Sequence, residues 1–220
     1  MTAGHIVDSP NAIVFQPSPF GLPDRVQRIG CVTRKSPDRT YRDLDEFLKP
    51  GNRKREVGKF DFAYIDVTIN PEATTYQIPG IHETDQTLTV GSPNIGERVR
   101  WLGSETGIVL NGRVVDIEYC LSKSDPADQN LMLLWPLTMI AVEGDIPSAR
   151  GDSGAAVVAE SGKIIGIHCQ GGTNKRGRHF TWASRIPSSP QELENGIYSA
   201  SMADAVTWMK KALQWMNPST

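Results

Sequence analysis

Ser153 is the residue whose surroundings best suit a nucleophile. It lies in Ala-Arg-Gly-Asp-Ser-Gly-Ala-Ala-Val-Val, between two glycines and directly before an apolar run. Gly151 and Gly154 allow backbone conformations closed to other residues, so the N–H groups of Gly151 and Ser153 can converge on one point and bind a developing oxyanion. The alternative interpretation is an ordinary hairpin turn, because Gly, Asp and Ser are common turn formers.

A serine hydroxyl needs a base within hydrogen-bond reach and a third group that orients this base. The chain has four histidines: His5, His82, His168 and His179. His5 follows small residues in Thr-Ala-Gly-His, and Asp61 opens the apolar run Asp-Phe-Ala-Tyr-Ile. Asp66 is the competing acid, but at an odd offset from Asp61 it faces the opposite side of a regular strand. We therefore expect His5 and Asp61 to serve Ser153, with His82 and His179 structural or exposed.

Three motifs in this order resemble those of the chymotrypsin-like serine peptidases: Thr-Ala-Gly-His at His5, Asp-Phe-Ala at Asp61 and Gly-Asp-Ser-Gly at Ser153. The resemblance implies that Ser153 attacks a scissile peptide carbonyl and that His5 takes its proton and delivers it to the leaving amine. Asp61 would orient the imidazole and stabilise the imidazolium. The implied substrate is a polypeptide, and no cofactor or metal is expected.

The resemblance also implies an all-β fold of two six-stranded antiparallel Greek-key barrels, which suits 220 residues. We assign residues 1–90 to the first barrel, 91–198 to the second and 199–220 to a C-terminal α-helix. Apolar residues recur at helical spacing after Ser201, a candidate N-cap.

Short β-branched runs bounded by turn residues predict the strands. They are Ala12–Phe15, Gln27–Arg34, Phe62–Thr68, Arg98–Leu102, Gly107–Leu121, Leu131–Ile140, Ala155–Ala159, Lys163–Cys169 and Phe180–Ser184. Asn111-Gly112 is typical of a type I′ hairpin turn.

The first barrel departs from the family pattern, because only four residues precede His5 where relatives have two or more strands. Strand edges would then be unpaired beside the general base. Four explanations are open: a truncated gene model, a fragment of a larger protein, a barrel completed by an upstream segment or partner chain, and an inactive relative.

In many relatives the acid before the serine pairs with a newly released N-terminal amine. This sequence offers no such terminus, so we expect Asp152 to pair with another group, and Arg150 and Lys163 are the candidates.

The residues before Ser153 and the strand after it build the S1 pocket in the family. Pro147 falls at the pocket base, where trypsin carries an aspartate, so a preference for Lys or Arg is disfavoured. Ser148 is a candidate for a polar residue in the pocket wall.

The run Ile-Ile-Gly-Ile-His-Cys-Gln-Gly-Gly is similar to that of glutamyl endopeptidases and viral 3C-like peptidases. This implies that His168 lies in S1 and donates a hydrogen bond to Glu or Gln at P1; the alternative is a histidine bonded to a neighbour on a buried strand.

The residues after His168 would pair with the substrate main chain by strand addition. These are Cys169, Gln170 and Gly171, and Gly171 would leave the pocket mouth open. We interpret Cys169 as a small packed residue rather than as a second nucleophile.

The net charge and the cysteine spacing give no support for a nucleic-acid-binding protein or for a zinc or redox protein. The formal net charge of −2 gives no electrostatic case for nucleic acid. The basic runs Arg53–Arg55, in a polar insertion over residues 34–59, and Lys175–Arg178 are interpreted as solvated loops. Cys31, Cys120 and Cys169 cannot all pair and have no zinc or redox spacing. With no signal peptide and no membrane span visible, an intracellular setting is favoured.

The sequence thus predicts a serine endopeptidase with a preference for Glu or Gln at P1. Two other classes stay open. One is a pseudopeptidase or peptide-binding module that keeps the cleft without a competent first barrel. The other is a regulatory segment of a larger multidomain protein.

Overall fold

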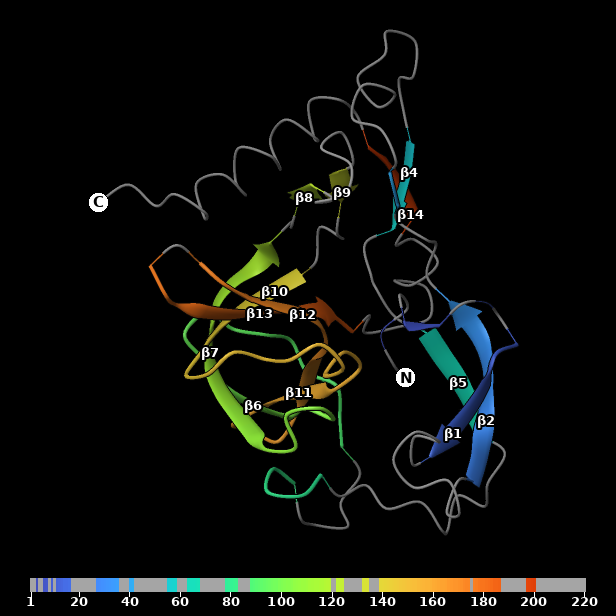
Figure 1. Ribbon diagram of the computed structural model, residues 1–220, viewed down its shortest axis with the longest axis horizontal. Coiled ribbons are helices and arrows are strands. Elements are labelled where there is room, and N and C mark those ends of the chain that lie inside the picture. The colour runs from blue at the N-terminus through green and yellow to red at the C-terminus, as the bar shows by residue number, and fades with distance from the viewer. Residues whose placement is uncertain are drawn as a thin grey trace, which may run out of the picture.

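Strands dominate the computed structural model of the chain (Figure 1). The structure describes residues 3, 6–7, 9, 11–16, 27–35, 40–41, 55–58, 63–67, 78–82, 88–119, 122–124, 132–134, 139–174, 176–186 and 197–200. Fourteen strands lie within these residues. No helix in this part of the chain is long and apolar enough to cross a membrane.

A closed antiparallel barrel carries the Ser153 turn. Its strand order is β10-β13-β12-β11-β6-β7. The strands are β6 (Arg98–Leu102), β7 (Val109–Tyr119), β10 (Met139–Gly144), β11 (Ala156–Ala159), β12 (Ile164–Thr173) and β13 (His179–Arg185). Alternate residues of these strands point inward, and they form a core that includes Val99, Trp101, Leu110, Val114 and Val142. The all-β prediction and the second barrel are confirmed.

The prediction of a hairpin turn at Asn111-Gly112 is wrong. Both residues lie inside β7, where Gly112 pairs with Val99 and Asn111 with Arg100. A Cβ on Gly112 would lie 2.5 Å from Cγ1 of Val142 and 3.2 Å from the ring of Trp101. Close packing inside the barrel, rather than a positive φ, therefore explains this glycine.

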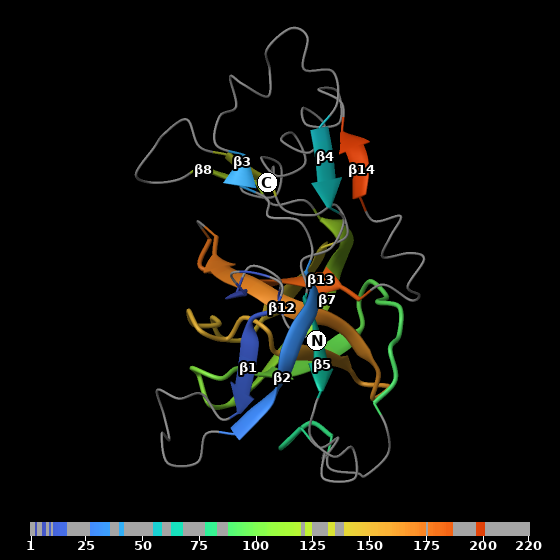
Figure 2. The same cartoon turned by 90° about the vertical axis from the view of Figure 1, so that its right-hand side faces the viewer.

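The first part of the chain forms a three-stranded antiparallel sheet with the order β1-β2-β5. Its strands are β1 (Ile13–Gln16), β2 (Gln27–Lys35) and β5 (Ala63–Val67), close to the predicted ranges. Val7, Val32 and Ala63 form its buried cluster. The sheet stands beside the barrel in Figure 1 and in front of it in Figure 2.

Two small sheets lie above the barrel and the first sheet in both views. One has the order β3-β9-β8, and the other pairs β14 with β4. Their strands are β3 (Thr40–Tyr41), β4 (Arg55–Gly58), β8 (Ser122–Ser124), β9 (Met132–Leu134) and β14 (Ile197–Ala200). Each sheet joins a strand from residues 1–90 to later strands.

These strands differ from the sequence-based expectations at three places. The predicted strand Leu131–Ile140 is replaced by the separate strands β9 and β10. Arg55, expected in a solvated loop, begins β4. Ser199 and Ala200 belong to β14 rather than to a helix, and the predicted helix beyond them lies outside the described residues, as do Cys120 and Lys175.

Candidate functional site

Ser153 lies in the turn that connects β10 to β11, and the turn is fastened to β12. Gly151 and Gly154 have φ values of +114° and +97°, a region that other residues rarely adopt. The N–H of Gly154 donates to the carbonyl of His168, and the N–H of His168 donates to the carbonyl of Ala155, each at 2.8 Å. The two glycines predicted to shape this turn therefore do so.

The Ser153 hydroxyl points toward β12 and donates to the carbonyl of Cys169 at 2.8 Å. The pairing of β12 with β13 changes register between His168 and Gln170, so Cys169 occupies a bulge. A bulge takes a residue out of the ladder and re-aims its groups, which turns the Cys169 carbonyl toward the serine. The Cys169 thiol is buried and lies 3.2 Å from the carbonyl of Ile167, as expected of a packed residue.

The N–H of Gly151 donates to no residue within the described part of the chain, and Gly151 is exposed. A backbone N–H of this kind, two residues before a serine hydroxyl, is available to the carbonyl oxygen of a bound ligand. The geometry of the turn thus suits the predicted oxyanion site of Gly151 and Ser153.

Asp152 is 1% exposed, and within the described residues its carboxylate accepts hydrogen bonds from uncharged donors alone. The N–H groups of Glu105 and Thr106 donate to Oδ1 at 2.9 and 3.1 Å, and the N–H of Ala149 donates to Oδ2 at 2.8 Å. The Thr106 hydroxyl lies 3.4 Å from Oδ1. The expectation that Arg150 or Lys163 pairs with Asp152 is therefore wrong. Backbone amides bind the buried carboxylate and compensate its lost hydration.

The turn that holds Asp152 spans Gly103 to Gly107, and the N–H of Gly107 donates to the carbonyl of Gly103. A Cβ on Gly103 would lie 2.3 Å from the carboxylate carbon of Asp152. A Cβ on Gly151 would lie 3.1 Å from Cβ of Glu105. The 103–107 turn thus supports the Ser153 turn at two points, and no sequence motif indicated it.

A cavity of about 520 Å³ opens beside Ser153. Leu102–Ser104 and Gly107 line one side of it, and Asp152–Ala155 line the other. The cavity therefore lies between the 103–107 turn and the Ser153 turn. Within the described residues, no group of three or more His, Cys, Asp or Glu side chains is placed to hold a metal ion.

The edge of β12 beyond His168 is the expected strand-addition surface. Gln170 and Gly171 pair with Trp182 and Thr181 of β13. On the other side, β11 pairs only with residues 164–167 of β12, so within the described residues no strand occupies the second edge at Gln170 and Gly171. A strand edge of this kind can pair with an added strand.

The predicted S1 residues lie around the barrel end next to this edge. His168 is 1% exposed, and its ring stacks on Trp101 with the centroids 6.5 Å apart. Ser148 lies against Gly171, where a Cβ would fall 1.7 Å from the Ser148 Oγ. Pro147, expected at the pocket base, is exposed.

Thr181 is a residue that sequence reasoning missed. It is 2% exposed, pairs with Gly171, and its hydroxyl donates to the Ser148 hydroxyl at 3.5 Å. The Ser148 hydroxyl fills the space that a side chain at position 171 would need, and the Thr181 hydroxyl lies next to it. The register between β12 and β13 puts Thr181 there, and the sequence carries no signal of this register because of the Cys169 bulge.

His5 and Asp61 lie outside the described residues, but their neighbours are described. Ala3 is fully buried and belongs to the same packed cluster as Cys169 and Ile167 of the barrel. Val7 and Ala63 share the core cluster of the first sheet. Ala3 thus packs against β12, whose Cys169 carbonyl accepts from Ser153, and Val7 packs against Ala63 at the start of β5.

No family model matches this chain, and no curated protein matches it either. Solved structures do. A chymotrypsin of Cellulomonas bogoriensis is 16% identical with a TM-score of 0.50, and the match covers 91% of this chain and 85% of that one. Protease A of Thermobifida fusca is 15% identical with a TM-score of 0.52, and the match covers 91% and 83%.

A third similar structure is a glutamic-acid-specific serine protease that uses a histidine triad in substrate binding. It is 17% identical with a TM-score of 0.55, and the match covers 89% of this chain and 83% of that one. Likeness at these identities shows the fold: this chain has the chymotrypsin-like double-barrel fold.

Proposed function

We propose that this chain is a serine endopeptidase that uses Ser153, His5 and Asp61. The observation that carries the proposal is the Ser153 turn itself. Its hydroxyl lies 2.8 Å from the Cys169 carbonyl, and the adjacent Gly151 has a φ of +114° and an N–H that no described residue accepts. A plain hairpin turn requires neither a buried Asp152 nor a second turn that supports it.

The packing of the residues next to His5 and Asp61 supports the proposed roles of these two side chains. His5 is two residues from Ala3 and two from Val7, and two residues span at most about 7 Å. Ala3 shares a cluster with Cys169, whose carbonyl accepts from Ser153. Asp61 is two residues before Ala63, which shares a cluster with Val7. These contacts of the neighbouring residues support the proposed grouping of His5 and Asp61 with Ser153.

The proposed reaction is an acyl transfer in two steps. Ser153 Oγ attacks the peptide carbonyl carbon while His5 takes the hydroxyl proton, and the oxygen that becomes negative accepts from the N–H groups of Gly151 and Ser153. His5 then protonates the leaving amine. A water, deprotonated by His5, releases the acyl group and restores the serine. Asp61 orients His5 throughout.

We further propose a preference for Glu or Gln at P1. The candidate pocket combines the hydroxyls of Ser148 and Thr181, 3.5 Å apart, with His168 on the adjoining strand. Hydroxyl and imidazole N–H groups donate hydrogen bonds to a carboxylate or amide oxygen. His168 is buried against Trp101, so its ring must turn toward a bound side chain to do so. The similar glutamic-acid-specific protease also binds its substrate through histidines.

Labelling with a fluorophosphonate probe tests the endopeptidase proposal. We expect the wild-type protein to react and to hydrolyse a peptide library after Glu or Gln. Ser153→Ala removes both activities. Ser161→Ala, in the exposed turn after β11, is the matched control and retains them. If wild-type protein neither reacts nor hydrolyses peptides yet binds them, the chain is a peptide-binding module instead.

A further inference from the structure

A second and larger cavity lies on the outer face of the barrel, apart from the Ser153 turn. Its volume is about 740 Å³, and it is lined by residues of β6, β7 and β10 with Asp145 and Glu160 beside them. Val99, Trp101, Leu110 and Val142 of these strands point into the core. The intervening residues therefore point outward.

Three charged residues form one row across the floor of this cavity. Arg98 of β6 pairs in register with Arg113 of β7, and Arg113 pairs with Glu143 of β10. Like charges directly opposite each other on adjacent strands repel. The carboxylate of Glu143 is the group in this row that would offset the repulsion.

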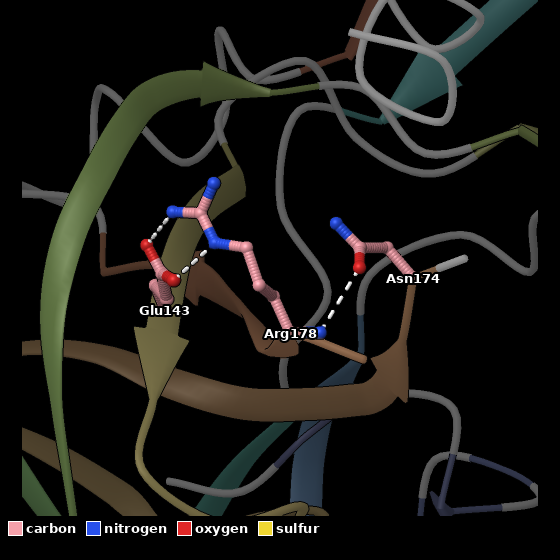
Figure 3. A network of polar contacts seen from close by, with 3 residues as sticks. All are labelled: Glu143, Asn174 and Arg178. Carbon is pink, nitrogen blue, oxygen red and sulfur yellow. Dashed lines mark hydrogen bonds and ion pairs between the residues drawn. The ribbon is translucent and has the colours of Figure 1, made fainter. Parts of the chain in front are cut away.

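Glu143 is bound to another residue. Both of its carboxylate oxygens accept from Arg178, one from Nε and one from a terminal nitrogen (Figure 3). Asn174 braces this arginine by accepting from its backbone N–H at 3.0 Å. Glu143 raises the pKa of Arg178 through the hydrogen bond and the opposite charge. A bidentate pair of this kind has a fixed geometry. Both carboxylate oxygens of Glu143 therefore face Arg178.

The remaining arginines differ in how far they are bound. Arg100 donates to the carbonyls of Gly80 and Ile81, at 3.2 and 3.3 Å. Arg113 donates one N–H to the carbonyl of Gly96 at 2.6 Å, which fixes its guanidinium. Within the described residues, Arg98 forms no ion pair or side-chain hydrogen bond, and neither Asp145 nor Glu160 lies within 4.0 Å of it or of Arg113.

We propose that this cavity is a binding site for an oxyanion group, a carboxylate or a phosphate, held between Arg98 and Arg113. Two guanidinium groups present planar forks of N–H donors that match such oxygens. The anion offsets the repulsion between two arginines, because the carboxylate in register with Arg113, that of Glu143, is bound to Arg178. Asp145 and Glu160 also line the cavity and disfavour further negative charge, so the ligand is a small molecule with one such group rather than a polyanion.

Isothermal titration tests the site with two probes, inorganic phosphate and acetate, in separate runs at an ionic strength kept constant with sodium chloride. We expect saturable binding of at least one probe. Arg98→Gln weakens the binding by about tenfold or more, because one of the two guanidinium groups that hold the anion is lost. Arg28→Gln, an exposed arginine on β2 of the other sheet, removes the same charge and leaves binding unchanged. Binding of phosphate alone identifies a phosphate site, and binding of both identifies a general oxyanion site.

A second variant tests the effect of the negative charge of Glu143 and of its ion pair with Arg178. Glu143→Gln removes the acid from the row and frees Arg178, so we expect the same probe to bind several-fold more tightly. The proposal is overturned if neither probe shows saturable binding to the wild-type protein, or if Arg98→Gln and Arg28→Gln bind alike. These measurements do not depend on peptide hydrolysis, so their outcome is separate from that of the proposed function.

Discussion

The carboxylate of Asp152 packs directly on Gly103, with no room for a side chain between them. This contact joins the turn that carries Ser153 to the 103–107 turn, although 46 to 49 residues separate them in the chain. The buried carboxylate accepts three backbone N–H bonds. The conformation of the Ser153 turn is therefore fixed by the folded barrel and needs no added charged group.

Asp152→Asn tests this anchoring. An amide has one acceptor oxygen, so its NH2 group faces N–H donors that the carboxylate satisfied. We expect kcat for peptide hydrolysis to fall by about 100-fold, the size of effect seen when an oxyanion donor is lost, with little change in KM. Steady-state kinetics give the answer, and an unchanged kcat would show that the turn keeps its shape unaided.

Gly103→Ala tests the same contact from the other side. The added methyl lies 2.3 Å from the Asp152 carboxylate carbon, so the carboxylate must move and the N–H of Gly151 moves with it. We expect a loss of kcat similar to that of Asp152→Asn. Gly144→Ala is the control, because its nearest neighbours are 3.4 Å away. Equal activity of the two alanine variants would contradict the prediction.

Thr181→Val tests the pocket assigned to P1. Valine keeps the volume of threonine and removes the hydroxyl that lies 3.5 Å from Ser148. We expect kcat/KM for Glu or Gln substrates to fall about tenfold, the value of one lost hydrogen bond, while substrates with Ala at P1 are unaffected. A library profile identical to that of the wild type would remove Thr181 from the pocket.

Gly112→Ala tests the close packing within the barrel. The methyl group would lie 2.5 Å from Val142 Cγ1, and overpacking of this kind costs about 1–3 kcal/mol. We expect the midpoint of urea unfolding to fall by a corresponding amount. If Asn111-Gly112 were an exposed hairpin turn, the substitution would have little effect on the core, so an unchanged midpoint would contradict the structure.

Local chemistry made several features predictable from the sequence. Gly151, Ser153 and Gly154 shape the turn through their own backbone preferences, and β-branched runs identified most strands of the barrel. The partners of Asp152 were not predictable, because they are backbone groups of residues that could be of almost any type. Charge alone favours Arg150 and Lys163 as partners, whereas the burial of Asp152 favours neutral backbone donors.

Glycine was also ambiguous from the sequence. Gly112 follows an asparagine, as a hairpin glycine often does. In the barrel it is required instead because a side chain there would collide with Val142 and crowd the ring of Trp101. Thr181 pairs with Gly171 because the bulge at Cys169 shifts the register between β12 and β13. Features of this kind arise when distant strands meet, and no local pattern reports them.

The most direct test of the central claim is to locate the covalent adduct. After incubation with a fluorophosphonate, tandem mass spectrometry of the digested protein should find one adduct, on Ser153. His5→Ala and Asp61→Ala should slow its formation by at least about 1000-fold, because the serine then lacks its oriented base. An adduct on another residue, or a Ser153 adduct that forms equally fast in both variants, would contradict the proposed triad.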